Sequence, residues 1–259
     1  MTAGEALQPG RNENLFRWLL LCLALAWILA AVMAAVSGFN AHPDEIFHVA
    51  AGEYYLTHWL PPRVTDTALL SSLSPYGFTY LGEIDATYLL AGRLASLLPE
   101  TLLAPHLRFR AFNLLLFLIL VVVYGARHER FSPIVLVLLT PQIWYVFSYF
   151  NNDALPLFLS LLLVGAVFES RTRLAAALSA PWRASMLIPL AGTGLLAGLL
   201  VVTKPNYLPV IAFVVFFAVC RAVGFAAAAI CVASAGLYLA RSRSFVSIPA
   251  SALSACLTI

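Results

Sequence analysis

Many of the residues that can take up a proton or bind a metal ion lie in one segment of this chain, residues 37–106. The segment holds seven of the twelve acidic residues and four of the five histidines. Its opening run contains His42, Asp44, Glu45 and His48. Such carboxylates and imidazoles can act as general bases or bind a divalent ion, but their spacing matches no defined metal-ligand pattern. The segment is therefore the first candidate for a functional site.

The same run predicts a helix from Pro43 to about His58. Proline suits the first helical position, and acidic residues are favoured in the first turn, so the acidic pair can equally serve only as a helix cap. At about 100° per residue, one face carries Asp44, Glu45, His48, Gly52 and Tyr55. The opposite face carries Ile46, Phe47, Ala50 and Tyr54. We expect the helix to lie along a membrane surface, with its apolar face among headgroups and its polar face lining a cavity above a bundle.

A second polar stretch, residues 74–98, combines aromatic, acidic and basic side chains. Its apolar spacing from Asp85 onward predicts another surface helix. Aromatic residues accompanied by Arg93 can contact a sugar or a lipid headgroup. An interfacial aromatic belt is the commoner role of such residues, so both interpretations stay open.

Two later turns add polar groups at the ends of apolar runs. Tyr149, Asn152 and Asp153 precede an apolar run that begins at residue 154, and Lys204 and Tyr207 lie between two further runs. An acidic residue at a membrane boundary is a functional candidate, although either Asn152 or Asp153 can cap the following helix. Lys204 can extend to the interface or bind a phosphate.

The elements that must position these residues are apolar helices. The chain has 259 residues, of which 62% are hydrophobic and 10% charged, and its mean hydropathy is +0.90. This composition predicts an all-α, polytopic transmembrane bundle of six or seven spans. The expected spans are residues 15–36, 109–125, 131–150, 154–168, 186–202, 207–219 and 223–240. The first is longer than the apolar core of a signal peptide and is interpreted as an uncleaved anchor.

The basic breaks at residues 127–130 and 171–183 predict the topology. The positive-inside rule places both breaks in the cytoplasm with the N-terminal tail, residues 1–14. The long first loop and the two later turns then face the extracytoplasmic side together. A seventh span would carry Arg241 and Arg243 outward against the rule, and the apolar tail, residues 244–259, has the pattern of a truncated chain. The transmembrane domain is expected over residues 15–243.

Two other classes of function gain no support. The net charge is only +3, and the arginines occupy short breaks instead of a continuous basic surface, which argues against nucleic acid binding. The four cysteines lie in apolar surroundings without a CxxC spacing. A disulfide framework or a cysteine metal site is therefore not expected.

The polar motifs, taken in order, resemble a known superfamily. PDEIFH at residues 43–48, SYFNND at 148–153 and KPNY at 204–207 follow an N-terminal span. Over about residues 15–209 the chain resembles the GT-C superfamily of polytopic glycosyltransferases, and most closely a bacterial branch with a P-D-E-x-x-H first loop. The resemblance implies transfer of a sugar from a polyprenyl-phosphate donor to a glycan, lipid or protein acceptor outside the bacterial inner membrane, usually with inversion.

The resemblance also implies roles for particular residues. Asp44 is the expected general base, and Glu45 orients it or the acceptor. Lys204, aided by Arg93 or His48, is expected to stabilise the departing phosphate. The expected substrate-binding residues are His48, Tyr55, Arg93, Tyr149, Asn152, Asp153, Lys204 and Tyr207. If a divalent ion such as Mg or Mn takes part, its ligands are expected to be Asp44, Glu45 and Asp153.

Two alternatives remain at the level of sequence. In a carrier or channel component, Asp153 and Lys204 would line a pathway, but the inverted repeats and broken midplane helices of transporters are not evident. A non-catalytic fragment or partner subunit is also compatible with the chain, because GT-C proteins are generally longer and have more spans.

Overall fold

The computed structural model describes residues 9–82, 85–126, 132–168, 172, 174, 176 and 184–223. Within these residues the regular elements are helices, and one isolated bridge joins Leu73 to Thr79. The predicted all-α class is confirmed for this part of the chain. The helices are α1 (Pro9–Val36), α2 (Glu45–Thr57), α3 (Ala86–Leu97), α4 (Pro105–Gly125), α5 (Pro133–Leu138), α6 (Pro141–Ser148), α7 (Ala154–Phe168), α9 (Leu187–Thr203) and α10 (Leu208–Val223), with 3-10 turns η1 (Thr67–Leu70), η2 (Ala184–Met186) and η3 (Pro205–Tyr207).

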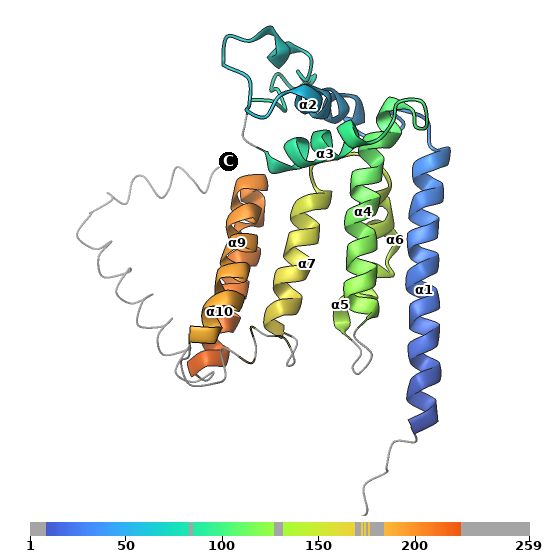
Figure 1. The fold of residues 1–259 in the computed structure, drawn as a ribbon, viewed down its shortest axis with the longest axis vertical. Helices are drawn as coiled ribbons and strands as arrows, with labels where there is room; N and C mark the ends of the chain where they lie inside the picture. Colours follow the sequence, from blue (N-terminus) through green and yellow to red (C-terminus); the bar gives the residue numbers. More distant parts are fainter. Residues whose placement is uncertain are drawn as a thin grey trace, which may run out of the picture.

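The long helices stand side by side, and the first loop covers one end of them. Figure 1 shows α1, α4, α7, α9 and α10 upright, with α2 and α3 lying across one end. Helix α4 packs on α1 and α7, and α7 packs on α9 and α10. Helices α2 and α3 pack on each other, and both contact α4. The two expected surface helices are thus present and lie across the bundle end.

Two helices are long and apolar enough to cross a membrane, Asn14–Val36 and Pro105–Gly125. Three shorter apolar helices cover Ala154–Phe168, Leu187–Thr203 and Pro205–Cys220. By this criterion the described residues contain two candidate spans, where the sequence predicted six or seven spans. The predicted seventh span, the tail 244–259, most of the two basic breaks and residues 1–8 lie outside the described residues.

The prediction of a single span over residues 131–150 is wrong. Two short helices, α5 and α6, divide this segment, and Pro141 begins the second of them. Proline lacks the N–H that would continue the helix and clashes with the carbonyl four residues earlier. Thr140, just before it, has the extended backbone that a following proline favours (φ −79°, ψ 139°). The polar turn 149–153 follows the end of α6, and its Tyr149 ring stacks on His42 of the first loop.

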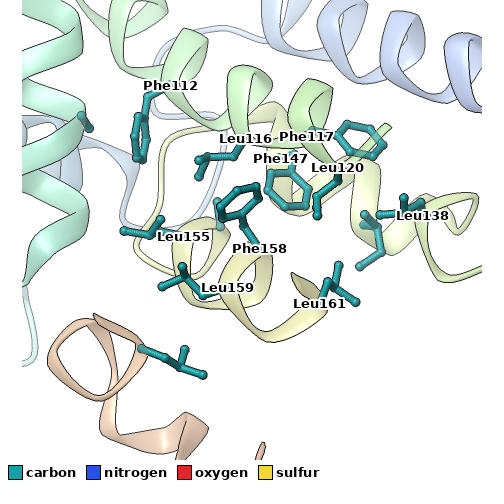
Figure 2. Packing of buried hydrophobic residues seen from close by; sticks show 14 of the residues in the cluster. Phe112, Leu116, Phe117, Leu120, Leu138, Phe147, Leu155, Phe158, Leu159 and Leu161 are labelled. Atoms are coloured by element: carbon teal, nitrogen blue, oxygen red, sulfur yellow. The ribbon is translucent and has the colours of Figure 1, made fainter. Parts of the chain in front are cut away.

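The apolar core fixes this turn in place. Figure 2 shows side chains of α4 packed against residues from α5, α6 and α7. The rings of Phe117 in α4 and Phe147 in α6 stack with centroids 5.2 Å apart and planes 10° from parallel. Between apolar helices in a bilayer, such close van der Waals packing is a main source of attraction. The connection between α6 and α7 therefore has a rigid base on both sides.

Helices α2 and α3 approach so closely that alanine is not tolerated at Gly92. A Cβ atom there would lie 2.7 Å from the Gly52 carbonyl oxygen and 2.7 Å from the Tyr55 Cβ atom. Because the first of these is backbone, we expect Gly92→Ala to lower the free energy of unfolding by about 1–3 kcal/mol. Thermal unfolding in detergent micelles measures the effect. Gly192→Ala in α9 is the matched control, since its Cβ would meet nothing within 4 Å. Equal midpoints for the two variants would contradict the close packing of α2 on α3.

Candidate functional site

A buried ion pair supports the start of the first loop. The Arg110 Nε and Nη2 atoms each donate to one oxygen of Glu45, at 2.7 Å in both cases. The side chains are 1% and 0% exposed, respectively. The remaining donors of Arg110 bind the carbonyl oxygens of Ala34 at 2.7 Å, Ser37 at 2.8 Å and Gly38 at 3.1 Å. This paired geometry satisfies a charge that would otherwise be costly inside the protein.

Glu45 also ties the loop to a distant turn. Its carboxylate accepts hydrogen bonds from the backbone N–H groups of Asn40 at 3.1 Å and Phe150 at 3.3 Å. Burial raises the pKa of Glu45, but the hydrogen bonds and positive charge of Arg110 outweigh this and lower the pKa below its ordinary value. Glu45 is therefore an ionised group whose oxygens are already occupied. Its contacts hold the loop, and its oxygens are not free to meet a ligand; that Glu45 orients Asp44 or the acceptor stays a prediction.

Asp44 differs from its neighbour in having a largely free carboxylate. The predicted helix start at Pro43 is wrong, because α2 begins at Glu45 and Asp44 is its N-cap residue in the left-handed region (φ 57°, ψ 7°). The Asp44 side chain makes no capping hydrogen bond. It accepts one hydrogen bond from the Tyr80 hydroxyl, at 3.3 Å. A left-handed conformation is uncommon for residues other than glycine, and aspartate and asparagine are the residues that tolerate it best.

His48 lies directly behind this carboxylate, one turn along α2. Its Nδ1 atom is 2.7 Å from the Tyr88 hydroxyl, and its ring lies 4.3 Å from the Tyr80 ring. Burial lowers the pKa of His48 to about 4, with Asp44 opposing the shift and Lys204 adding to it. The imidazole is thus neutral at physiological pH, and the charges of Asp44 and Lys204 both act on it.

Lys204, the only lysine of the chain, joins the cluster from the far end of α9. Its Nζ atom lies 2.5 Å from the Asp153 Oδ1 atom and 3.2 Å from the Asn152 Oδ1 atom. Asn152 in turn donates to the Asp85 Oδ2 atom at 3.5 Å. The side chains of Lys204 and Asp153 are 22% and 49% exposed, so a ligand can reach this pair. The two later turns and the first loop therefore meet at one end of the bundle.

Asp153 occupies the N-cap position of α7, since it directly precedes the helix and its carbonyl oxygen accepts from the Leu157 N–H at 3.0 Å. The side-chain capping bonds, however, come from Asn151, whose Oδ1 atom accepts from the backbone N–H groups of Asp153 at 2.9 Å and Ala154 at 3.0 Å. Because Asn151 satisfies the free N–H groups at the start of the helix, the side chains of its two successors are free to bind Lys204.

The other predicted site residues divide into two groups. Tyr149 lies beside the cluster, where its ring stacks on His42 with centroids 4.5 Å apart. Tyr207 is partly buried in η3 against the hydrophobic core, and Tyr55 is buried in the core itself. The buried position of Tyr55 gives this residue a packing role in place of the substrate contact predicted for it.

Arg93 does not reach the cluster. Its guanidinium lies over the Trp59 ring, 4.2 Å from the centroid, and also donates to the carbonyl oxygen of His58. The predicted part of Arg93 in binding phosphate is therefore wrong for this conformation. Contact with an aromatic residue at the loop surface fits the alternative of an interfacial belt.

The three carboxylates expected to hold a divalent ion, Asp44, Glu45 and Asp153, do not form a metal site either. Among the described residues, no group of three or more His, Cys, Asp or Glu side chains is placed to hold a metal ion. One of the expected ligands, Glu45, is committed to Arg110. The residues present therefore do not fit a divalent ion held by Asp44, Glu45 and Asp153.

Several residues of this site were not recognised from the sequence. Arg110 is the clearest case, and its signal was an arginine inside the predicted apolar span 109–125, where a charged residue requires a partner. Asp85, Tyr80 and Tyr88 belonged to the second polar stretch, but their partners come from two other segments, the start of α2 and the turn before α7. Local spacing alone gives no means of pairing them.

Compared with protein-family models, curated proteins and solved structures, the chain matches none. The cluster is therefore interpreted from its own geometry. It combines a free carboxylate at Asp44, a neutral imidazole at His48 and a reachable cation at Lys204 beside Asp153. These groups can accept a proton, donate a hydrogen bond and bind an anion.

Asp85 should make the stability of the chain depend on pH. It caps α3 by accepting from the Thr87 N–H at 2.7 Å, and burial raises its pKa from 3.8 to about 6. The folded state therefore holds the proton more tightly than the unfolded state, so this contribution to stability is complete below pH 4 and is lost as pH rises to about 6. We expect Asp85→Asn, which keeps a capping side chain, to gain stability relative to wild type over this range, by up to about 2–3 kcal/mol.

Thermal unfolding of both proteins from pH 4 to pH 7.5 measures the difference in their free energies of unfolding. Groups such as His48 titrate in both proteins, so their contributions cancel in this difference. Asp66→Asn is the matched control, because Asp66 caps η1 in the same loop but is exposed. A constant difference between Asp85→Asn and wild type across this range would contradict the prediction.

Proposed function

We propose that the chain is a polytopic membrane glycosyltransferase of the GT-C type, which transfers a sugar from a polyprenyl-phosphate donor to an extracytoplasmic acceptor. The observation that carries the proposal is the free carboxylate of Asp44 in one cluster with the reachable Lys204–Asp153 pair. The first group suits proton removal, and the second suits a phosphate. The order of the PDEIFH, SYFNND and KPNY motifs supports the same conclusion.

The reaction requires a proton acceptor at one end of the cluster and a cation for the phosphate at the other. The acceptor hydroxyl gives its proton to Asp44 while its oxygen forms a bond to the anomeric carbon of the sugar. The bond from that carbon to the phosphate oxygen breaks, and polyprenyl phosphate departs with the electron pair. Attack from the face opposite the phosphate inverts the anomeric carbon. Lys204 stabilises the negative charge that develops on the departing phosphate.

The surface of α9 suits the lipid part of such a donor. This helix ends at Lys204 and leaves Leu195, Val201 and Val202 exposed. A Cβ atom built on Gly194 or Gly198, which share this side of the helix, would meet nothing within 4 Å. An isoprenoid chain can lie along this apolar surface in the bilayer while its phosphate reaches Lys204. In this arrangement the shorter apolar helices also cross the membrane.

The position of the charges favours this function over transport. Asp153 precedes α7 and Lys204 follows α9, so both lie at helix ends. Figure 1 shows α2 and α3 lying across one end of the bundle. A transported solute requires binding groups near the middle of the membrane. Chemistry at the interface, on a substrate whose tail stays in the bilayer, requires them at one end.

We expect Lys204→Gln to weaken binding of a polyprenyl phosphate about tenfold to a hundredfold, because a hydrogen bond to a charged group contributes about 1.5–3 kcal/mol. Equilibrium binding of farnesyl phosphate to the full chain in lipid nanodiscs measures the loss. Lys204→Arg keeps the charge and is the matched control, with a smaller expected loss. Equal affinity of wild type and Lys204→Gln would contradict phosphate binding at this position. Release of polyprenyl phosphate from a polyprenyl-phosphate sugar by the wild-type chain tests the activity itself.

A further inference from the structure

The two ring nitrogens of His48 have different surroundings. Nδ1 lies 2.7 Å from the Tyr88 hydroxyl, and both residues are buried, at 6% and 1% exposed. Within the described part of the chain, Nε2 has no hydrogen-bond partner. Asp44, Lys204 and Asp153 all act electrostatically on the ring. One nitrogen is thus bound within the protein, and the other is left for a ligand in the charged cluster.

The buried hydroxyl decides which nitrogen carries the proton. Burial raises the pKa of Tyr88 well above its ordinary value, so its O–H stays protonated. His48 is the hydrogen-bond partner of this hydroxyl among the described residues, and a buried donor without an acceptor costs about 1–3 kcal/mol. Tyr88 therefore donates and Nδ1 accepts. A neutral imidazole has one protonated nitrogen, and this must be Nε2.

We infer that Tyr88 is a positioning residue that fixes His48 as the Nε2–H tautomer, so that His48 donates a neutral hydrogen bond to a phosphate oxygen of the substrate. The inference rests on the proposed function for the identity of that ligand. A protonated Nε2 atom has no lone pair to give, so it neither binds a metal ion nor removes a proton. His48 thereby supplements Lys204 at the phosphate, while proton removal stays with Asp44.

Nitrogen-15 NMR of the full chain, labelled at histidine and held in nanodiscs, tests the inference directly. The ¹⁵N shifts and ring couplings separate protonated from bare nitrogens, and the signals of His48 are those lost in His48→Gln. We expect wild type to show a bare Nδ1 and a protonated Nε2 at pH 7. Tyr88→Phe is expected to show both tautomers. Tyr80→Phe is the matched control, because the Tyr80 hydroxyl donates to Asp44 and its ring contacts the same histidine.

Farnesyl phosphate then tests the donor role, with farnesol as the uncharged control. We expect the phosphate to shift the Nε2 signal and farnesol to leave it unchanged. Among variants, His48→Gln, whose amide can donate from a similar position, should bind the phosphate within about threefold of wild type, and His48→Leu about tenfold more weakly.

Each outcome has a separate meaning. A protonated Nδ1 in the wild-type protein would overturn the tautomer and with it the part of Tyr88. A protonated Nε2 that does not respond to bound farnesyl phosphate would overturn the donor role. If farnesyl phosphate fails to bind the chain at all, the proposed function fails, together with the donor role that rests on it, while the tautomer is still decided by the first measurement.

Discussion

Replacing Arg110 by methionine is expected to destabilise the chain by about 3–5 kcal/mol, the largest effect on stability that the structure predicts. The substitution leaves the carboxylate of Glu45 buried without its counter-charge. It also removes the donors that bind the carbonyl oxygens of Ala34, Ser37 and Gly38 at the end of α1. Thermal unfolding in micelles and the yield of folded protein in the membrane fraction measure the loss.

Arg108→Met is the matched control for this substitution. Arg108 lies two residues away in α4 and pairs at 3.0 Å with Glu100, whose side chain is 77% exposed. The Arg108 side chain is only 6% exposed, but removing it leaves Glu100 in solvent and no buried charge unpaired, so this variant should unfold much closer to wild type. Removing both charges of the buried pair, as Glu45→Leu with Arg110→Met, should recover part of the loss, because no buried charge then remains unpaired. Similar unfolding midpoints for Arg110→Met and Arg108→Met would contradict the buried pair.

The helices that could be predicted from the sequence are those set by local residues. The spans expected at 109–125, 154–168 and 186–202 agree with α4, α7 and α9 to within a few residues. Long apolar runs bounded by polar or proline-containing breaks determine these elements, whatever they pack against. The segment expected as one helix at 131–150 is divided before Pro141, whose effect on a helix is also local and could have been recognised.

The orientation of α2 was predicted better than its start. Its predicted polar face places Glu45, His48 and Tyr55 in the interior, and the opposite face leaves Ile46 40% exposed. The start was misplaced because the turn before it is left-handed at Asn40 and Asp44. That turn is held by the hydrogen bonds of Glu45 and Arg110, a contact between residues 65 positions apart. Helical periodicity contains no information on such a contact.

The sequence placed Asp44, His48 and the two later turns on one side of the bundle, but it did not predict their pairings or all of their neighbours. Lys204 and Asp153 were expected on one side of the membrane because the alternation of spans fixes which turns share a side. Their ion pair, and the link through Asn152 to Asp85, depends on how α3, α7 and α9 pack. Arg93 was assigned to the phosphate from its residue type, yet packing directs it to Trp59. Residue type shows what a group can bind, and the tertiary fold decides which partner it meets.

Replacing Asp44 by asparagine is expected to lower sugar transfer by about 10²–10⁴-fold, the contribution of a positioned general base. The amide keeps the shape of the side chain and its hydrogen-bonding oxygen but cannot accept the proton of the acceptor hydroxyl. The measurement is transfer of a labelled sugar by the purified chain, or the level of a surface glycan in a strain that depends on this protein. Asp66→Asn, an exposed aspartate in the same loop, should transfer at the wild-type rate.

The fold should survive this substitution, which is why its effect on activity is informative. Asp44 makes no capping bond, and asparagine is among the residues that best tolerate the left-handed backbone at this position. The Tyr80 hydroxyl can donate to an amide oxygen as it does to the carboxylate. Unfolding midpoints and protein levels should therefore match wild type, so that lost transfer reports on chemistry alone. Unchanged transfer at equal protein levels would rule out Asp44 as the base, whereas the buried pair of Glu45 and Arg110 would keep its structural role.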